Sequence, residues 1–170
     1  MKHLLTVVAL FMIIQSQAQT PEDRLKEKGL TLPTVSKPIA NYVNVVRVGN
    51  LLFLSGKGPL QADGTNIVGK VGKDLTLEQG YAAAQLVALH HIAVLKSELG
   101  DLSKVKRIVK VLGLVQCEGS FYDQPKVING YSDMMGAIFG EKGKHARSAI
   151  GAIALPGNIC VEVEVVVEVE

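Results

Sequence analysis

The last ten residues of the chain alternate almost without interruption between valine and glutamate, and this pattern restricts the possible folds more than any other feature. The odd-numbered positions are all valine: Val161, Val163, Val165, Val167 and Val169. Four of the five even-numbered positions are glutamate: Glu162, Glu164, Glu168 and Glu170. Successive side chains of a β-strand point to opposite faces, so the alternation predicts a strand with one buried face and one solvated face.

A second β-rich stretch, residues 145–155, precedes this strand, and Leu155-Pro156-Gly157-Asn158 reads as the turn that joins the two runs. Arg147 opens the stretch and is flanked by small residues that leave its guanidinium accessible. An arginine close to a carboxylate on an adjacent strand has two interpretations. It is either a structural ion pair with Glu162, which is then one solvated strand glutamate among several, or an anion clamp beside a catalytic base.

The N-terminus has the layout of a secretory signal peptide, with Lys2, an uncharged apolar stretch over residues 4–14 and small residues at Ser16 and Ala18. A buried N-terminal helix or a retained anchor are the alternatives, although a membrane-spanning helix needs about 20 apolar residues. We expect cleavage after Ala18, a mature chain beginning at Gln19 and a periplasmic or secreted location. No cysteine follows the apolar stretch to carry a lipid, so no membrane association is expected after cleavage.

Net charge argues against a nucleic-acid-binding surface. Removing residues 1–18 takes away one lysine and no acidic residue, which leaves 152 residues, enough for one domain, and reduces the formal charge from +2 to +1. The only cysteines, Cys117 and Cys160, have no metal-site spacing. They either pair in an oxidising compartment or remain free as small core residues.

Capping and turn residues mark where the predicted helices and strands begin and end. Thr20 and Pro21 begin a short helix that ends at Gly29, and an extended connector follows over residues 30–40. Two apolar β-branched runs surround Gly49-Asn50, a hairpin turn. Residues 67–71 form a short third candidate strand.

A long helix begins after Thr76, where Gln79 completes a capping box, and ends at Gly100. His90 and His91 lack a second metal ligand at the i+4 position, so a surface histidine beside a buried, hydrogen-bonded one is the preferred interpretation. A strand over residues 105–115 and a helix over residues 125–139, capped by Asp123 and ended by Gly140, precede the final strands. This irregular order predicts an α+β fold with helices on one face of the sheet.

Several short motifs occur in a fixed order. They are Asn41-Tyr42-Val43, Gly49-Asn50-Leu51, Leu54-Ser55-Gly56, Asn129-Gly130-Tyr131, Ala146-Arg147-Ser148-Ala149, Leu155-Pro156 and Val161-Glu162-Val163-Glu164. Together they resemble the Rid family of small reactive-imine deaminases, also called YjgF. The resemblance covers residues 39–170, so we expect three parts in the chain: a signal peptide (residues 1–18), a short helix and linker (19–38) and a RidA-like domain (39–170).

The resemblance implies a chorismate-mutase-like fold, in which a mixed sheet carries two main helices on one face, and a homotrimer with sites in the clefts between subunits. It implies that Arg147 holds a substrate carboxylate and that Glu162 deprotonates the water that attacks an imine carbon, giving a 2-keto acid and ammonia. The residues implied to line the pocket are Tyr42, Ser55, Gly56, Asn129 and the backbone of Ala149. No metal or organic cofactor is implied.

Two positions depart from the familiar family pattern, since Ala149 stands where cysteine is common and Lys57 where glutamine is common. Two other functions remain open. One is a non-catalytic, small-ligand-binding or chaperone-like trimer. The other is an endoribonuclease, an activity attached to the family's name, which would require the RNA-binding surface that the near-neutral charge argues against.

Overall fold

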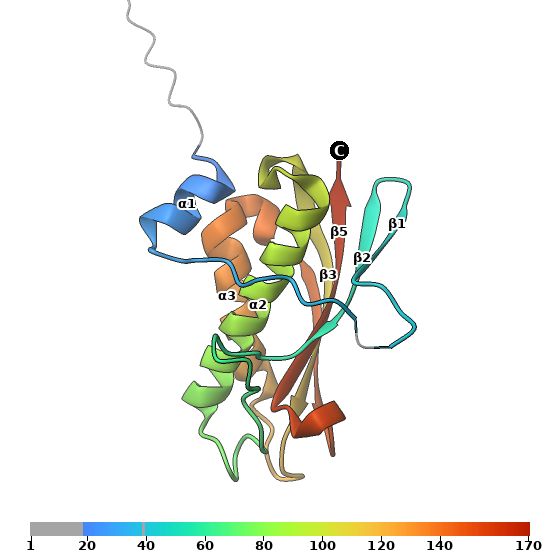
Figure 1. Ribbon diagram of the computed structural model, residues 1–170. Coiled ribbons are helices and arrows are strands. Elements are labelled where there is room, and N and C mark those ends of the chain that lie inside the picture. Colours follow the sequence, from blue (N-terminus) through green and yellow to red (C-terminus); the bar gives the residue numbers. More distant parts are fainter. Residues whose placement is uncertain (1–18, 39) are drawn as a thin grey trace, which may run out of the picture.

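The computed structural model describes residues 19–38 and 40–170, and it has an α+β fold in which two long helices cover one face of a five-stranded sheet and a third, short helix packs on the outside of them (Figure 1). The helices are α1 (Pro21–Glu27), α2 (Leu77–Leu99) and α3 (Gln124–Phe139), and the strands are β1 (Val45–Val48), β2 (Leu51–Lys57), β3 (Val105–Gln116), β4 (Ala146–Ala152) and β5 (Val161–Val169). Single 3₁₀ turns span Leu102–Lys104, Gly140–Gly143 and Pro156–Asn158. The fold class predicted from the sequence is confirmed. The expected signal peptide (residues 1–18) and the predicted domain start at residue 39 lie outside the described residues.

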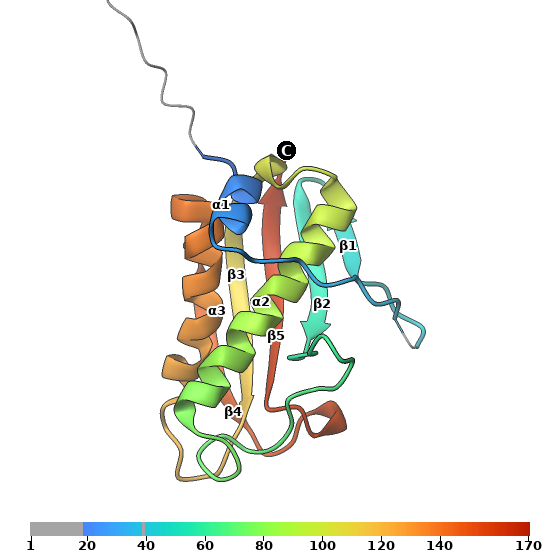
Figure 2. The ribbon, with the colours of Figure 1, turned by 60° about the vertical axis from the view of Figure 1, so that its left-hand side comes forward.

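β5 is the central strand, and its alternation produces the predicted two-faced arrangement. The five alternating valines are between 0% and 2% exposed and pack under α2, while the glutamates and Val166 face the opposite side of the sheet. The strand order is β1-β2-β5-β3-β4, so β5 pairs with β2 and β3, both antiparallel (Figure 2).

The strand that contains Arg147 is not adjacent to the strand that contains Glu162, contrary to the sequence-based interpretation. β4 pairs only with β3, in parallel, and β3 separates it from β5 within the described chain. The reason is that α3 connects β3 to β4 as a crossover, which places β4 parallel to and beside the strand it left. The turn at Pro156–Asn158 therefore leads the chain past β3 and does not form a hairpin.

Residues 67–71 do not form the expected strand. Val68 and Val71 make only isolated bridges, to Ile159 and to Leu75 and Cys117. Gly69 and Gly72 have φ angles of 111° and 88°, outside the extended region, and they interrupt the run.

The ends of the helices follow the sequence signals with one exception. Thr20 and Thr76 both form capping boxes, and Gly100 ends α2 in the left-handed conformation at φ 72°. Asp123 occupies the N-cap position of α3, but its side chain makes no capping bond and instead pairs with Lys126 at 3.0 Å. Within the described ranges, no helix has the length and apolarity needed to cross a membrane.

His90 is buried, which corrects the prediction of a surface histidine. It is 8% exposed, and its Nε2 lies 2.8 Å from the carbonyl oxygen of Leu60. The irregular segment after β2 passes over this part of α2 and covers the ring, an effect of tertiary packing that helical periodicity does not report.

His91 is fully buried and links α2 to both α3 and β2. Its Nε2 lies 3.2 Å from the carbonyl oxygen of Ser55, and its Nδ1 lies 2.9 Å from the hydroxyl of Tyr131. Because a carbonyl can only accept, Nε2 carries the proton and Nδ1 accepts the tyrosine O–H. Burial lowers the pKa of His91 from 6.5 to about 4.

This buried imidazole is expected to make the protein acid-sensitive. The unfolded chain binds a proton at His91 below pH 6.5, whereas the folded chain resists it until about pH 4. Stability is therefore lost as pH falls through that window, by up to about 3 kcal/mol. Denaturant titrations at pH 7 and pH 4.5 should show a smaller drop in His91→Gln than in the unsubstituted protein. An equal drop in both would assign the acid sensitivity to other groups.

The two cysteines are both free and buried in the folded chain, so the structure shows the core-residue alternative and not a disulfide. Burial raises the pKa of Cys160 to about 11, which keeps it as an unreactive thiol.

Candidate active site

Arg147 lies on the helix-covered face of the sheet and is held by α3. Its register partner in β3 is Val111, a core residue, so its side chain extends toward the helices. The Nη1 atom donates to Asn129 Oδ1 and to Ser132 Oγ, each at 2.9 Å, and Nη2 donates to the Pro125 carbonyl at 3.4 Å. A guanidinium has five N–H donors. The donors not used in these three bonds remain for an anion. Asn129, which the family resemblance implies to line the pocket, contacts the guanidinium directly.

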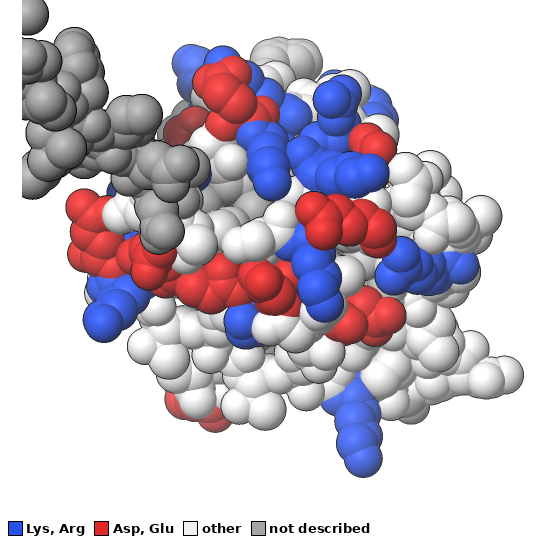
Figure 3. Space-filling model, turned by 90° about the horizontal axis from the view of Figure 1, so that it is seen from above, with Lys and Arg blue, Asp and Glu red and all other residues white. Residues whose placement is uncertain are grey.

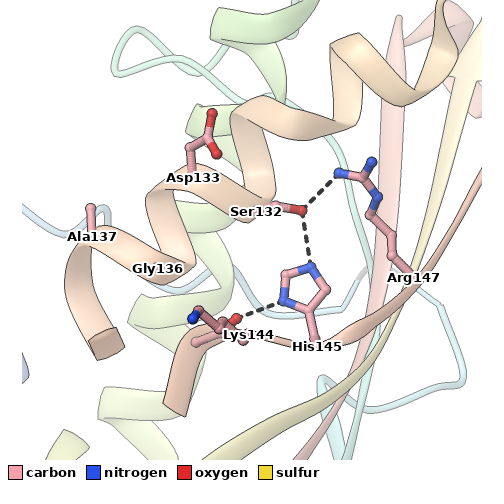
Figure 4. Close-up of a pocket in the computed structure, with 8 residues that line it drawn as sticks. Ser132, Asp133, Gly136, Ala137, Lys144, His145 and Arg147 are labelled. Carbon is pink, nitrogen blue, oxygen red and sulfur yellow. Dashed lines mark hydrogen bonds between the residues drawn. The ribbon is translucent and has the colours of Figure 1, made fainter. Parts of the chain in front are cut away.

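A cavity of about 750 Å³ opens beside this arginine (Figure 4). It is lined by Ser132, Asp133, Gly136, Ala137, Gly143, Lys144, His145 and Arg147. Ser132 of α3, His145 of the segment directly before β4 and Arg147 of β4 point toward one another. Lys144 and Arg147 supply two positive charges and Asp133 one negative charge, so the lining has a net positive charge that suits a small anion.

Ala149 lies two residues beyond Arg147 and shares its face of β4. It is half-buried against the core and lies opposite Gly113 of β3.

Glu162 lies on the opposite, uncovered face of the sheet, beside Gly56. Its register partner is Leu114, which alternates with the buried Gly113 and Val115 and therefore faces outward. A Cβ atom on Gly56 would collide with the Glu162 carboxylate, whose Cδ would lie 3.0 Å away. Burial, and secondarily the charge of Glu164, raises the pKa of Glu162. The carboxylate is thus a stronger base than an exposed glutamate.

Ser55 and Gly56 form a β-bulge between β2 and β5, and Gly56 of this bulge lies against Glu162. The Ser55 hydroxyl donates to the carbonyl of Val43 at 2.6 Å. Tyr42 is the neighbour of Val43, and its side chain is 51% exposed. The sequence-predicted residues Ser55, Gly56, Glu162 and Tyr42 therefore belong to one part of the molecule.

Lys57 follows the bulge, and its Nζ donates to Asn44 Oδ1 at 2.6 Å. Burial lowers the pKa of this lysine. The ammonium is thus anchored to the segment that precedes β1.

The predicted site residues therefore form two groups on opposite faces of the sheet. The arginine group contains Arg147, Asn129 and Ala149, and the glutamate group contains Glu162, Gly56 and their neighbours. The described residues Arg147 and Glu162 are not paired with each other, because the carboxylate and the guanidinium face opposite sides and β3 lies between their strands. The structural ion-pair interpretation is wrong for a single chain.

Comparisons with known proteins identify the family. The model of the family described as "YjgF/chorismate_mutase-like, putative endoribonuclease" matches residues 22–169. The chain belongs to the YjgF/chorismate mutase-like family. Protein TCP17 of Trypanosoma cruzi is 41% identical over 145 residues, which cover 85% of this chain and 91% of that protein.

Two solved structures are similar to the chain in both sequence and shape. The protein Atu1372 with unknown function from Agrobacterium tumefaciens is 41% identical with a TM-score of 0.82, over 89% of this chain and 94% of that one. A putative endoribonuclease from Shewanella oneidensis is 37% identical with a TM-score of 0.85, over 88% and 99%. The fold is therefore established across nearly the whole described chain.

Ser132 and His145 are residues of this YjgF-family cavity that the sequence reasoning missed. His145 stands two residues before Arg147, and extended backbone places residues i and i+2 on the same face. That spacing was a usable signal for His145. Ser132 gave no comparable signal, because a single serine on an amphipathic helix has no distinguishing pattern.

Proposed function

We propose that this YjgF-family chain is a hydrolase that converts small 2-imino or enamine acids into 2-keto acids and ammonia. The observation that carries the proposal is the guanidinium of Arg147, which three acceptors of α3 hold in place and which retains unused N–H donors beside a cavity. A planar guanidinium binds a carboxylate through two parallel hydrogen bonds, so it can fix both the position and the orientation of such an acid.

Glu162 supplies the base in this proposal. Its carboxylate takes a proton from water while the water oxygen bonds to the imine carbon and the C=N electron pair moves to nitrogen. Return of this proton to the nitrogen gives a carbinolamine. Glu162 then moves the hydroxyl proton of the carbinolamine to the same nitrogen, so that the C–N bond breaks, ammonia leaves and the C=O bond forms. A raised pKa makes the carboxylate a better proton acceptor, and the reaction requires no cofactor.

The site is proposed to form between copies of the chain, because the two groups cannot reach one small substrate in a single copy. The uncovered sheet face that carries Glu162 also exposes apolar side chains, among them Val46 at 52%, Phe53 at 44% and Ile150 at 50%. A neighbouring copy would bury this face and bring its own Arg147 group to Glu162. A homotrimer, as the family resemblance implies, satisfies this geometry.

The direct test is ammonia release from a panel of imines generated in solution from different amino acids. Faster release than in buffer, and saturation at increasing imine concentration, would support the proposal. Binding of a 2-keto acid without acceleration would instead support the non-catalytic trimer.

RNA cleavage is less well supported as a function of this chain. The end of the molecule seen in Figure 3 has acidic and basic side chains interspersed over the described surface, not a continuous basic area. The formal charge of the whole chain is only +2. Non-specific RNA binding depends on an excess of lysine and arginine at the phosphates.

Gly56→Ala is expected to impair the proposed hydrolysis with little effect on stability. The added methyl group collides with the Glu162 carboxylate, which is the free end of a flexible side chain and can move aside. The base is then displaced, and a misplacement of about 1 Å can reduce turnover by about a hundredfold. The measurements are turnover number and melting temperature, with Gly119→Ala as control because an added Cβ there meets no atom within 4 Å. Unchanged turnover in Gly56→Ala would remove Glu162 from the mechanism.

A further inference from the structure

Ser132 and His145 form a hydrogen-bonded pair, and the proposed deamination uses Ser132 only to hold Arg147 and gives His145 no role. The distance from Ser132 Oγ to His145 Nε2 is 3.0 Å, and His145 Nδ1 lies 2.7 Å from the carbonyl oxygen of Gly143 (Figure 4). The carbonyl can only accept, so Nδ1 carries the ring proton. Nε2 is therefore the acceptor, and the serine hydroxyl donates to it.

The imidazole is poised to accept the serine proton. Burial, and secondarily the positive charge of Arg147, lowers the pKa of His145. The charged groups around the ring are Arg147 and Lys144 from its own segment and Asp133 from α3. The ring is consequently neutral at pH 7, the form in which a general base acts.

Arg147 completes the arrangement. Its Nη1 atom donates to Ser132 Oγ at 2.9 Å, and this bond favours the oxygen as it loses its proton. The same guanidinium retains N–H donors that its three bonds to α3 do not use, and these are available to stabilise negative charge on an attacked carbonyl. The cavity of about 750 Å³ beside them has room for a small acyl group.

We propose that Ser132 is a nucleophile, activated by His145, that hydrolyses small carboxylic esters in this cavity. The Ser132 proton moves to His145 Nε2 as Oγ bonds to the acyl carbon. The C–O bond to the alcohol then breaks, and the departing oxygen takes the proton from Nε2. Water attacks the acyl-serine with His145 as base, and the acid leaves as Oγ regains a proton.

The test uses a fluorophosphonate, which forms a stable bond only to an activated serine. We expect the mass of the intact full-length chain to increase by one adduct, located at Ser132 by peptide mapping. Ser132→Ala should gain none, and His145→Gln should react roughly a hundredfold more slowly. Ser97→Ala, which removes an exposed serine of α2, should react like the unsubstituted protein.

The activity measurement is the release of 4-nitrophenol from 4-nitrophenyl acetate, which Ser132→Ala should lose while its melting curve stays cooperative. No adduct on the unsubstituted chain, or an adduct elsewhere, would overturn the proposal. Glu162→Gln separates the two functions, because it should lose imine hydrolysis and retain the adduct. Imine hydrolysis without an adduct would overturn only the esterase proposal.

Discussion

Arg147→Ala is expected to abolish imine hydrolysis and weaken 2-keto acid binding by roughly tenfold to a hundredfold, since a hydrogen bond to a charged group contributes about 1.5–3 kcal/mol. Arg147→Lys should recover little, because one ammonium cannot reproduce two parallel N–H donors. The fold should survive, since β3 and β4 remain paired and Asn129 and Ser132 are not fully buried. Calorimetry with a 2-keto acid and thermal melting measure the two effects. A large loss of stability with unchanged affinity would assign Arg147 a structural role.

Mixing two inactive variants tests where the groups of one site come from. Arg147→Ala removes one group and Glu162→Gln the other. If a site takes its arginine from one copy and its glutamate from the next, equal amounts refolded together should recover about a quarter of the unsubstituted activity, because each group is intact in half of the copies. Mixing without refolding is the control, since preformed assemblies exchange slowly. Failure to recover activity in a mixed assembly would place both groups in the same copy.

Most strands and helices could be predicted from the sequence, because the residues that determine each one lie within it or directly beside it. Alternation identified β5, and Thr76 and Gly100 marked both ends of α2. The position of β4 was not readable from alternation, because the pattern defines the faces of a strand but not its neighbours. The order of β3, α3 and β4 contained that information, since a helix between two strands favours a parallel pair. The burial of His90 depended on an irregular segment and had no local signal.

The sequence motifs predicted which residues belong to the site. They did not predict the contacts that those residues make in the folded chain. The resemblance named Arg147 and Asn129, and the structure joins them through a hydrogen bond. It also named Gly56 and Glu162. Their close approach depends on the bulge in β2, and the sequence pattern of this strand does not indicate a bulge. The separation of Arg147 from Glu162 follows from strand order and register. Two residues in one motif-rich stretch therefore need not share a site within one chain.

Gly130→Ala should produce a large loss of stability. Gly130 lies in α3, where a Cβ atom would collide with the backbone carbonyl of Tyr81 in α2, and its carbon would lie 2.9 Å away. A side chain could rotate away, but a helix backbone cannot, so the two helices must separate. The Tyr81 hydroxyl, which donates to Asp133 at 2.8 Å, would be pulled from its partner. We expect a net loss of about 3 kcal/mol, toward the upper end for overpacked interiors.

Gly136→Ala is the matched control, because it places the same methyl group in the same helix where nothing lies within 4 Å. Alanine favours helix over glycine by about 1 kcal/mol, so this variant should melt slightly higher. Gly130→Ala should melt lower by roughly 6–12 °C. It should also slow imine hydrolysis, because Asn129 moves with the displaced helix and loosens Arg147. Equal melting temperatures for both variants would show that the two helices do not approach at Gly130. If Gly130→Ala lowered the melting temperature and left imine hydrolysis unchanged, the packing of α3 on α2 would not control the position of Arg147.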